Sequence, residues 1–377
     1  MSGKIWLRRI LLPFLLSRAG LWAVGILALA LLGSARERMP GNLLAHTPAA
    51  LPLEIWARWD SEWYLLIARE GYAADRSLAT YSAGYRPGDT AGFFPLYPLL
   101  LTILERLGVP EVAAGILLSN MALLTALTLL YLLVREEWDD HAAGAAVWVL
   151  LGFPFSLFFS AVYCESVALA LTLGGFLLAR RRRWGWLGLC GFFCALARPT
   201  GLLVAPALAW EVKERRGGWR GALALLGFPA GVAAFSACCG FLFSDPLIWE
   251  TRQERWRGSL SGPWKAFKRF FESSPSLHGA HNSILEFCLA LLFLVALVPV
   301  LRKTPRSWGT YALLCVMVPL GSTLWSFGRL ALMAFPVFAW MGFLLRRDSS
   351  ALAGYLALCL PLGGLLMAFF ACGWWAG

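Results

Sequence analysis

The sequence predicts an all-α polytopic membrane protein. Hydrophobic residues make up 59% of the chain and charged residues only 15%, and the mean hydropathy is +0.65. An ordinary soluble domain is excluded, because about half of its residues are apolar and about a quarter charged. The apolar stretches reach the length of about 20 residues that a helix needs to cross a bilayer, and no alternating pattern suggests a β-barrel. We therefore expect one integral-membrane domain, residues 1–377, built as a helical bundle.

The basic residues occur in short clusters between the apolar stretches. The formal net charge is +11, and much of the excess lies at 180–183, 213–216, 302–306 and 346–347. Cytoplasmic loops of membrane proteins are enriched in Lys and Arg. The clusters therefore predict topology rather than a nucleic-acid partner. The basic amino end, which precedes the apolar run starting at Ile10, belongs on the same cytoplasmic side.

Keeping these clusters on one side requires an even number of spans between them, which leads to about eleven transmembrane helices. In chain order the expected spans are 10–32, 111–134, 142–161, 165–179, 184–197, 200–210, 220–243, 284–301, 308–325, 328–345 and 351–372. The region 33–107 then lies outside, with Phe93–Leu107 on the outer leaflet or only dipping into it. A second non-cytoplasmic loop covers 244–283.

An acidic and aromatic segment, residues 58–72, interrupts the apolar chain. It predicts a short interfacial helix that begins at Asp60 and stops at Gly71, with Trp63 and Tyr64 at headgroup depth. A carboxylate there is well placed to accept a proton from a hydroxyl group. Asp60 is thus a candidate general base, but a role as the N-cap of the helix also accounts for it.

Three further charged residues lie in apolar surroundings. Glu165 is either a functional acid or a solvated residue at a helix start, where the helix dipole favours negative charge. Arg198 and Arg329 are lone cations, and a charge at the bilayer centre costs about 2.5–3.5 kcal/mol. Their partner is either a carboxylate such as Glu165 or Asp60, or a lipid phosphate, which the arginine fork binds through paired hydrogen bonds.

The topology places the polar candidates on the same side of the membrane, so that one cavity can gather them. They are Asp60, Glu62, the segment Phe93–Pro98, Glu165, Arg198 and Arg329. The segment Arg198-Pro199-Thr200-Gly201 also has the interruption of a broken helix, which membrane proteins tolerate where the break lines a cavity.

Other features of the sequence favour structural roles. The nine cysteines lie mostly in apolar segments, and we expect buried thiols. His278 and His281 are too few to predict a metal, so no metal site is expected. The segment 263–271 predicts an amphipathic surface helix with Trp264, Phe267 and Phe271 on one face and cations that attract anionic lipid headgroups on the other.

Four segments in order resemble the motifs of the PIG-V mannosyltransferases, which add the second mannose in GPI-anchor synthesis, and of their prokaryotic relatives. The segments are Trp59-Asp60-Ser61-Glu62-Trp63-Tyr64 with Ile67-Ala68 and Gly71-Tyr72, then Phe93-Phe94-Pro95-Leu96-Tyr97-Pro98, Phe158-Phe159-Ser160-Ala161-Val162-Tyr163-Cys164-Glu165-Ser166, and Ala197-Arg198-Pro199-Thr200-Gly201. The resemblance spans roughly residues 10–345. Pro199-Thr200 stand where the family usually has Ser-Asn.

The resemblance implies a GT-C glycosyltransferase, a multi-span enzyme that takes a sugar from a polyprenyl- or dolichyl-phosphate carrier on the non-cytoplasmic face. It implies an inverting mannosyltransferase that transfers to a lipid-linked or glycolipid acceptor without a separate cofactor. The compact loops favour a prokaryotic plasma-membrane enzyme. The alternatives from other classes are a lipid-linked-sugar transporter or flippase and a nonenzymatic scaffold, and the acidic first loop favours an enzyme.

The likeness maps the catalytic acid to Asp60, with Glu62 and then Glu165 as the next candidates for the base. Arg329 or Arg198 would stabilise the leaving phosphate, since cations already aimed at a developing charge need no reorganisation. The remaining candidates for substrate binding are Arg58 and four aromatic residues, Trp63, Tyr64, Phe94 and Tyr97. The aromatic rings would frame the sugar or the polyprenyl chain.

Overall fold

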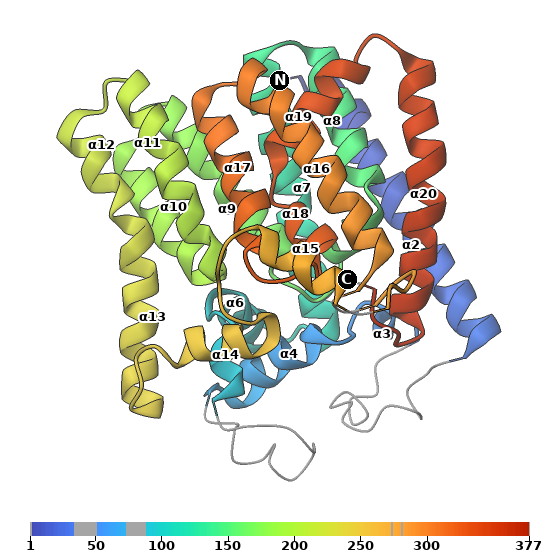
Figure 1. Cartoon of the computed structure of the whole chain (residues 1–377), viewed down its shortest axis with the longest axis horizontal. Helices are drawn as coiled ribbons and strands as arrows, with labels where there is room; N and C mark the ends of the chain where they lie inside the picture. Colours follow the sequence, from blue (N-terminus) through green and yellow to red (C-terminus); the bar gives the residue numbers. More distant parts are fainter. Residues whose placement is uncertain (1, 34–50, 73–87, 273, 280–281, 377) are drawn as a thin grey trace.

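The computed structural model describes residues 2–33, 51–72, 88–272, 274–279 and 282–376, and within these ranges all regular elements are helical (Figure 1). One isolated bridge joins Ser276 and Ser283. The all-α prediction is confirmed for the described part of the chain.

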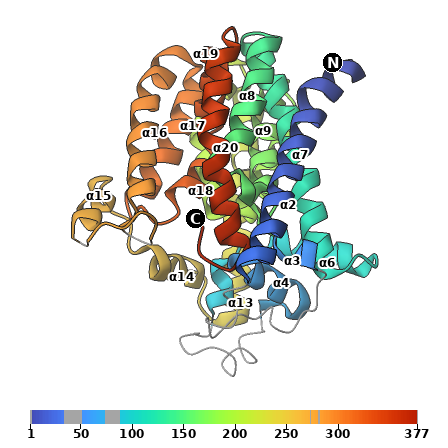
Figure 2. The same ribbon diagram turned by 90° about the vertical axis from the view of Figure 1, so that its right-hand side faces the viewer.

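The helices of the bundle run along its length in both views (Figures 1 and 2). From the amino end they are α1 Gly3–Trp6, which continues through the π-helical turn η1 Leu7–Leu11 into α2 Leu12–Leu32, then α7 Glu111–Glu137, α8 Asp140–Gly152, α9 Glu165–Arg180, α10 Trp184–Ala197, α11 Val204–Glu214, α12 Gly218–Leu225, α13 Gly227–Phe243, α16 Ile284–Lys303, α17 Arg306–Leu320, α19 Phe335–Leu345 and α20 Ser349–Ala371. The remaining elements are α3 Leu51–Glu54, α4 Asp60–Glu70, η5 Asp89–Gly92, α6 Leu96–Arg106, η6 Pro154–Phe159, η7 Pro199–Leu203, α14 Ile248–Arg257, α15 Trp264–Phe271 and α18 Phe327–Ala331.

Five helical stretches among the described residues are long and apolar enough to cross a membrane. They are Gly3–Leu32, Glu111–Glu137, Gly218–Phe243, Ile284–Lys303 and Ser349–Ala371. The protein is therefore an integral membrane protein. The expected count of about eleven spans stays a prediction, because the other bundle helices are shorter than 18 residues.

Several expected spans are interrupted rather than continuous; span 200–210, for example, changes from η7 to α11 at Val204. Span 142–161 leaves the α-helix at Gly152 and continues as η6 from Pro154, because proline has no backbone donor for a continuing helix. Span 220–243 divides at Leu226, next to Gly227, which packs so closely on the Gly188 backbone that no Cβ fits. Span 328–345 divides between α18 and α19.

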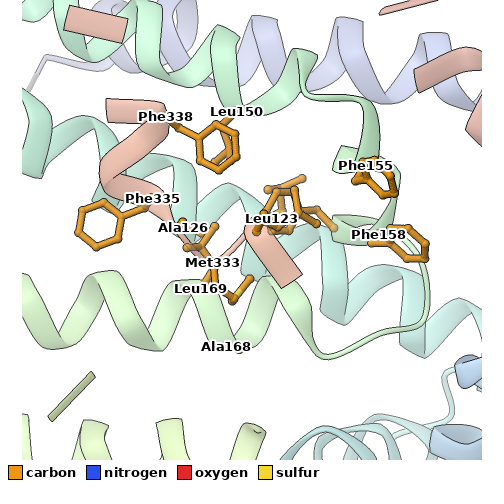
Figure 3. Packing of buried hydrophobic residues seen from close by; sticks show 14 of the residues in the cluster. Leu123, Ala126, Leu150, Phe155, Phe158, Ala168, Leu169, Met333, Phe335 and Phe338 are labelled. Carbon is orange, nitrogen blue, oxygen red and sulfur yellow. The ribbon is translucent and has the colours of Figure 1, made fainter. Parts of the chain in front are cut away.

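The core of the bundle is an apolar cluster formed by residues far apart in the sequence. In Figure 3, Leu123 and Ala126 of α7, Leu150 of α8, Leu169 of α9 and Phe338 of α19 point into the space between these helices. All five side chains are fully buried. Close packing of this kind fixes the relative positions of the helices that carry the site.

The predicted basic clusters gather at one end of the bundle. Arg180 pairs with Glu137 at 2.9 Å and with Glu211 at 3.4 Å, and Arg346 pairs with Asp139 at 3.3 Å. The amino terminus lies at the same end, whereas α4, α6 and α14 lie at the opposite end in both views (Figures 1 and 2). The elements of the two expected outer loops therefore meet away from the basic clusters.

Candidate active site

A cavity of about 1010 Å³ is lined by α4, by α14 and by the ends of several bundle helices. Seven of the ten side chains predicted for the site line it: Asp60, Trp63, Tyr64, Phe94, Glu165, Arg198 and Arg329. The broken helix contributes as expected, since Arg198 adopts an extended conformation between α10 and η7, and 197–200 form part of the wall.

The helix predicted to begin at Asp60 and stop at Gly71 is present as α4 Asp60–Glu70, but its cap residue differs. Trp59, not Asp60, occupies the cap position, with φ 57° and ψ −115°, and no side chain caps the helix. Gly71 ends it with φ 73°, as predicted. The N-cap interpretation of Asp60 is therefore wrong, because this residue is the first helical residue and its side chain bonds elsewhere.

Tyr163 fixes the unusual turn at Trp59. Its hydroxyl donates to the carbonyl of Arg58 and accepts from the backbone N–H of Asp60, both at 3.1 Å. A positive φ is uncommon for a bulky residue and persists only where surrounding structure holds it. The fully buried phenol thus holds both sides of the turn that positions Asp60.

Asp60, Arg329, Glu165 and Arg198 form one chain of ion pairs along the cavity wall. Arg329 Nη1 lies 2.6 Å from Asp60 Oδ2, and its Nε lies 3.5 Å from Glu165 Oε1. Arg198 Nη1 donates to the same Glu165 oxygen at 3.1 Å. Each arginine therefore has a carboxylate partner, the first of the two alternatives that the sequence left open.

Arg329 is held further by aromatic faces. The guanidinium carbon lies 5.3 Å from the ring centroid of Tyr163 and 5.7 Å from that of Trp375. Cations attract ring faces at such distances. Because paired charges and rings surround it on several sides, Arg329 is a rigid support for the Asp60 carboxylate.

Two carboxylate oxygens of this chain have no hydrogen-bond partner among the described residues. Asp60, whose side chain is 26% exposed, uses only Oδ2, and no described residue bonds its Oδ1. Glu165 is 2% exposed, so the solvated alternative for this residue is wrong, and its Oε2 has no hydrogen-bond partner among the described residues. A buried acceptor without a donor is unfavourable unless a ligand or water supplies one.

Three predicted site residues do not line the cavity. Arg58 donates to the carbonyl of Ala371 at 3.1 and 3.2 Å and pairs with Glu54, so it ties α3 to the end of α20. Tyr97 lies behind Tyr64, with ring centroids 5.0 Å apart. Glu62 is buried on α4 and is absent from the lining. Their predicted roles in catalysis or substrate binding are therefore not supported by their positions.

Aromatic rings form a continuous part of the wall. Trp63 stacks on Phe93 with centroids 5.4 Å apart and an interplanar angle of 14°, and Phe93 contacts Trp256 at 5.4 Å. Phe94 packs edge-on against Trp249 at 5.5 Å. Flat apolar faces beside polar oxygens suit a sugar, which presents both C–H and hydroxyl groups.

The cavity contains an element that the sequence analysis missed. Helix α14 lines it with six residues, Trp249, Glu250, Gln253, Glu254, Trp256 and Arg257. Burial, together with the nearby charges of Arg329 and Arg198, lowers the pKa of Arg257 to about 9. The positions 249, 250, 253, 254, 256 and 257 repeat at helical spacing, a signal that identifies one face of a helix but not what that face meets.

Two other features predicted for the outer loops are the amphipathic helix 263–271 and the histidines His278 and His281. α15 packs Phe270 on Phe287, with centroids 4.3 Å apart, while Trp264 and Phe271 are exposed. His278 lines the cavity and contacts the carbonyl of Trp375 at 3.0 Å, and burial lowers its pKa. His281 lies outside the described residues. Within those residues, no three His, Cys, Asp or Glu side chains form a group that fits a metal.

Comparison with known proteins identifies one relative of established class. No family model matches the chain. A stretch of 196 residues is 30% identical to GPI mannosyltransferase 2 of Chaetomium globosum. The matched stretch covers 45% of this chain and 40% of the relative. The chain thus matches less than half of the length of that protein. The similarity supports a membrane-bound, mannosyltransferase-like character for the region that it covers.

Proposed function

We propose that the protein is a membrane glycosyltransferase, specifically a mannosyltransferase of the GT-C kind. It moves a sugar from a polyprenyl- or dolichyl-phosphate carrier to a hydroxyl group of a lipid-linked or glycolipid acceptor. The observation that carries the proposal is Asp60, which lines a large aromatic cavity and pairs with Arg329 through one of its two oxygens. The similarity to a GPI mannosyltransferase supports the reaction class.

The proposed reaction is a single inverting displacement. The acceptor oxygen attacks the anomeric carbon while Asp60 Oδ1 removes its proton, and the bond between the anomeric carbon and the phosphate oxygen breaks. Proton transfer to a positioned base contributes about two to four orders of magnitude in rate. Arg329 holds the other oxygen of the same carboxylate at 2.6 Å, so the base keeps a fixed orientation during the transfer.

Glu165 has a binding role in this proposal. Its free Oε2 accepts a hydrogen bond from a sugar hydroxyl, while Arg198 and Arg329 hold the other oxygen. The arginines then act through the carboxylates rather than as direct phosphate ligands. This replaces the expectation that one of them binds the leaving phosphate.

The proposal also includes the membrane setting. The cavity lies at the end of the bundle opposite the basic clusters, and the positive-inside rule puts such clusters in the cytoplasm. The active site then faces the non-cytoplasmic side of the plasma membrane of a prokaryote. The aromatic and cationic helix α15 would rest on the lipid surface, in contact with anionic headgroups.

The test is a reaction with purified protein. Polyprenyl-phosphate-mannose is incubated with the protein and a membrane lipid extract, and mass spectrometry identifies new glycolipids. A product heavier than its acceptor by one hexose, absent with the Asp60→Asn variant, is expected. Movement of the donor between leaflets of a vesicle without any new product would instead establish the transporter alternative.

A further inference from the structure

Among the described residues, three guanidinium groups line the cavity, and they differ in how their charges are compensated. Arg198 and Arg329 are paired with Glu165 and Asp60 at 2.6–3.5 Å. Arg257, in the last turn of α14, forms no ion pair with any described residue. Its Nη2 donates instead to the carbonyl of Trp325 at 2.8 Å.

The described groups around Arg257 do not neutralise its charge at close range. The other two arginines repel it, and carboxylates that attract it, Glu286 and Asp60, lie beyond ion-pair distance. A partly buried cation without a close counter-ion is costly, and arginine binds phosphate well because its planar fork gives two parallel hydrogen bonds. The carbonyl bond to Trp325 uses one side of the fork, which leaves other N–H groups for a ligand.

Two exposed leucines that line the same cavity as Arg257 indicate what kind of phosphate fits. Leu260 and Leu277 line the cavity, yet they are 64% and 75% exposed. An apolar surface next to a cationic site suits a lipid phosphate, whose hydrocarbon chain covers the leucines while its phosphate contacts the guanidinium. A free phosphate ion would leave this apolar surface in water.

We propose that Arg257 binds the phosphate of the prenyl-phosphate sugar donor, and that α14 is the donor-binding helix. The inference rests on the proposed function for the identity of the donor. As the anomeric C–O bond breaks, its electron pair stays on the phosphate oxygen, and the phosphodiester becomes a phosphomonoester with additional negative charge. A cation that is not already neutralised by a carboxylate stabilises this charge more than the paired Arg198 and Arg329 do.

The first test measures binding without turnover. Citronellyl phosphate, a short prenyl phosphate, is titrated into the detergent-purified protein by calorimetry, with citronellol, inorganic phosphate and phosphatidylglycerol as separate probes. Arg257→Gln should weaken citronellyl phosphate binding by about tenfold to a hundredfold, the effect of a lost charge-assisted hydrogen bond. Citronellol and inorganic phosphate should bind far more weakly than citronellyl phosphate. Equal binding of phosphatidylglycerol would overturn the donor assignment and mark a general lipid-headgroup site.

Arg255→Gln is the matched control on the same helix. Arg255 pairs with Asp89 at 2.6 Å, a carboxylate also approached by Arg252, and it does not line the cavity. The control variant removes the same charge and should bind citronellyl phosphate as the wild type does. Weakening by both variants alike would overturn the specific role of Arg257.

A second test uses the wild-type protein, so it does not depend on a variant that folds. Phenylglyoxal modifies accessible arginines, and peptide mass spectrometry follows each site separately. Citronellyl phosphate should slow the modification of Arg257, whereas citronellol should not. Modification of Arg257 at an unchanged rate with saturating citronellyl phosphate would contradict the proposal.

The results of these experiments distinguish a wrong donor class from a wrong assignment of the phosphate-binding residue. If the wild-type protein binds no prenyl phosphate at all, the donor class in the proposed function fails. If it binds prenyl phosphate and Arg257→Gln binds equally well, only the assignment to Arg257 fails.

Discussion

At the scale of single residues, the Asp60 carboxylate has two different oxygens. One is held by Arg329 at 2.6 Å, and the other accepts no hydrogen bond from a described residue of the cavity that Asp60 lines. A base needs both accessibility and a fixed direction. Here the direction comes from a residue 269 positions later in the chain.

Tyr163 contributes by holding the backbone turn that positions Asp60, and removing its hydroxyl oxygen tests this role. Tyr163→Phe deletes the hydroxyl that holds both sides of Trp59, so the turn relaxes and Asp60 moves. We expect the turnover number to fall by about tenfold to a hundredfold, because small misplacements of catalytic groups are costly. The KM for the donor should change little.

The control for that variant is Tyr131→Phe. Tyr131 is also fully buried, and its hydroxyl bonds the Asp140 carboxylate, outside the cavity lining. Both variants should lose about 1 kcal/mol of stability, the usual contribution of one hydrogen bond. An equal loss of turnover in both variants would show that Tyr163 acts only through general stability.

At the scale of elements, two glycines give opposite forecasts for the same substitution. Gly342 of α19 lies against the backbone and Cβ of Ala146 in α8, with no room for a Cβ, whereas Gly354 of α20 has open space around it. Gly342→Ala should destabilise the protein by about 1–3 kcal/mol through overpacking. Gly354→Ala should be neutral or stabilising by up to about 1 kcal/mol, because alanine favours the helix.

Thermal unfolding of the two variants in detergent provides the measurement. The melting temperature of Gly342→Ala should fall below that of the wild type, and that of Gly354→Ala should not. An unchanged melting temperature for Gly342→Ala, with a lower one for Gly354→Ala, would contradict the close packing of α19 against α8.

The elements also show what sequence reasoning can reach. The expected spans 111–134, 165–179 and 184–197 match α7, α9 and α10 closely, because apolar runs bounded by charges or proline identify helices locally. The sequence analysis did not predict the interruption at Pro154 or the division of the helix at Leu226. The division at Leu226 depends on the contact of Gly227 with Gly188, which lies on a different helix. The position of α14 in the cavity wall was missed for the same reason, as its polar sequence says nothing about the cavity that it meets.

At the scale of the whole molecule, the bundle has two chemically distinct ends. Ion pairs around Arg180 and Arg346 mark one end, and the cavity with Asp60 marks the other. The sequence predicted that the charged candidates would share one side. It left the pairing of Asp60 with Arg329 as one of two alternatives, because the choice between a carboxylate and a phosphate partner depends on distances in the folded chain.

The assignment of these ends to the two sides of the membrane can be tested by labelling. Single cysteines replace Ser261 near the cavity end and Glu214 in the basic cluster, and each variant is compared with the native cysteine background. An impermeant maleimide should label Ser261→Cys in intact cells and Glu214→Cys only after permeabilisation, as the positive-inside rule predicts. The reverse pattern would place the cavity in the cytoplasm.

The central claim is that Asp60 acts as the base in sugar transfer from a lipid phosphate, and its most direct test compares two matched variants. Asp60→Asn keeps the shape of the side chain but removes a proton acceptor. Asp89→Asn makes the same change at a carboxylate that pairs with Arg252 and Arg255 outside the cavity lining. Turnover of polyprenyl-phosphate-mannose is measured for both at matched amounts of folded protein. We expect Asp60→Asn to lose about two to four orders of magnitude and Asp89→Asn to stay near the wild-type rate; near wild-type turnover by Asp60→Asn would contradict the account.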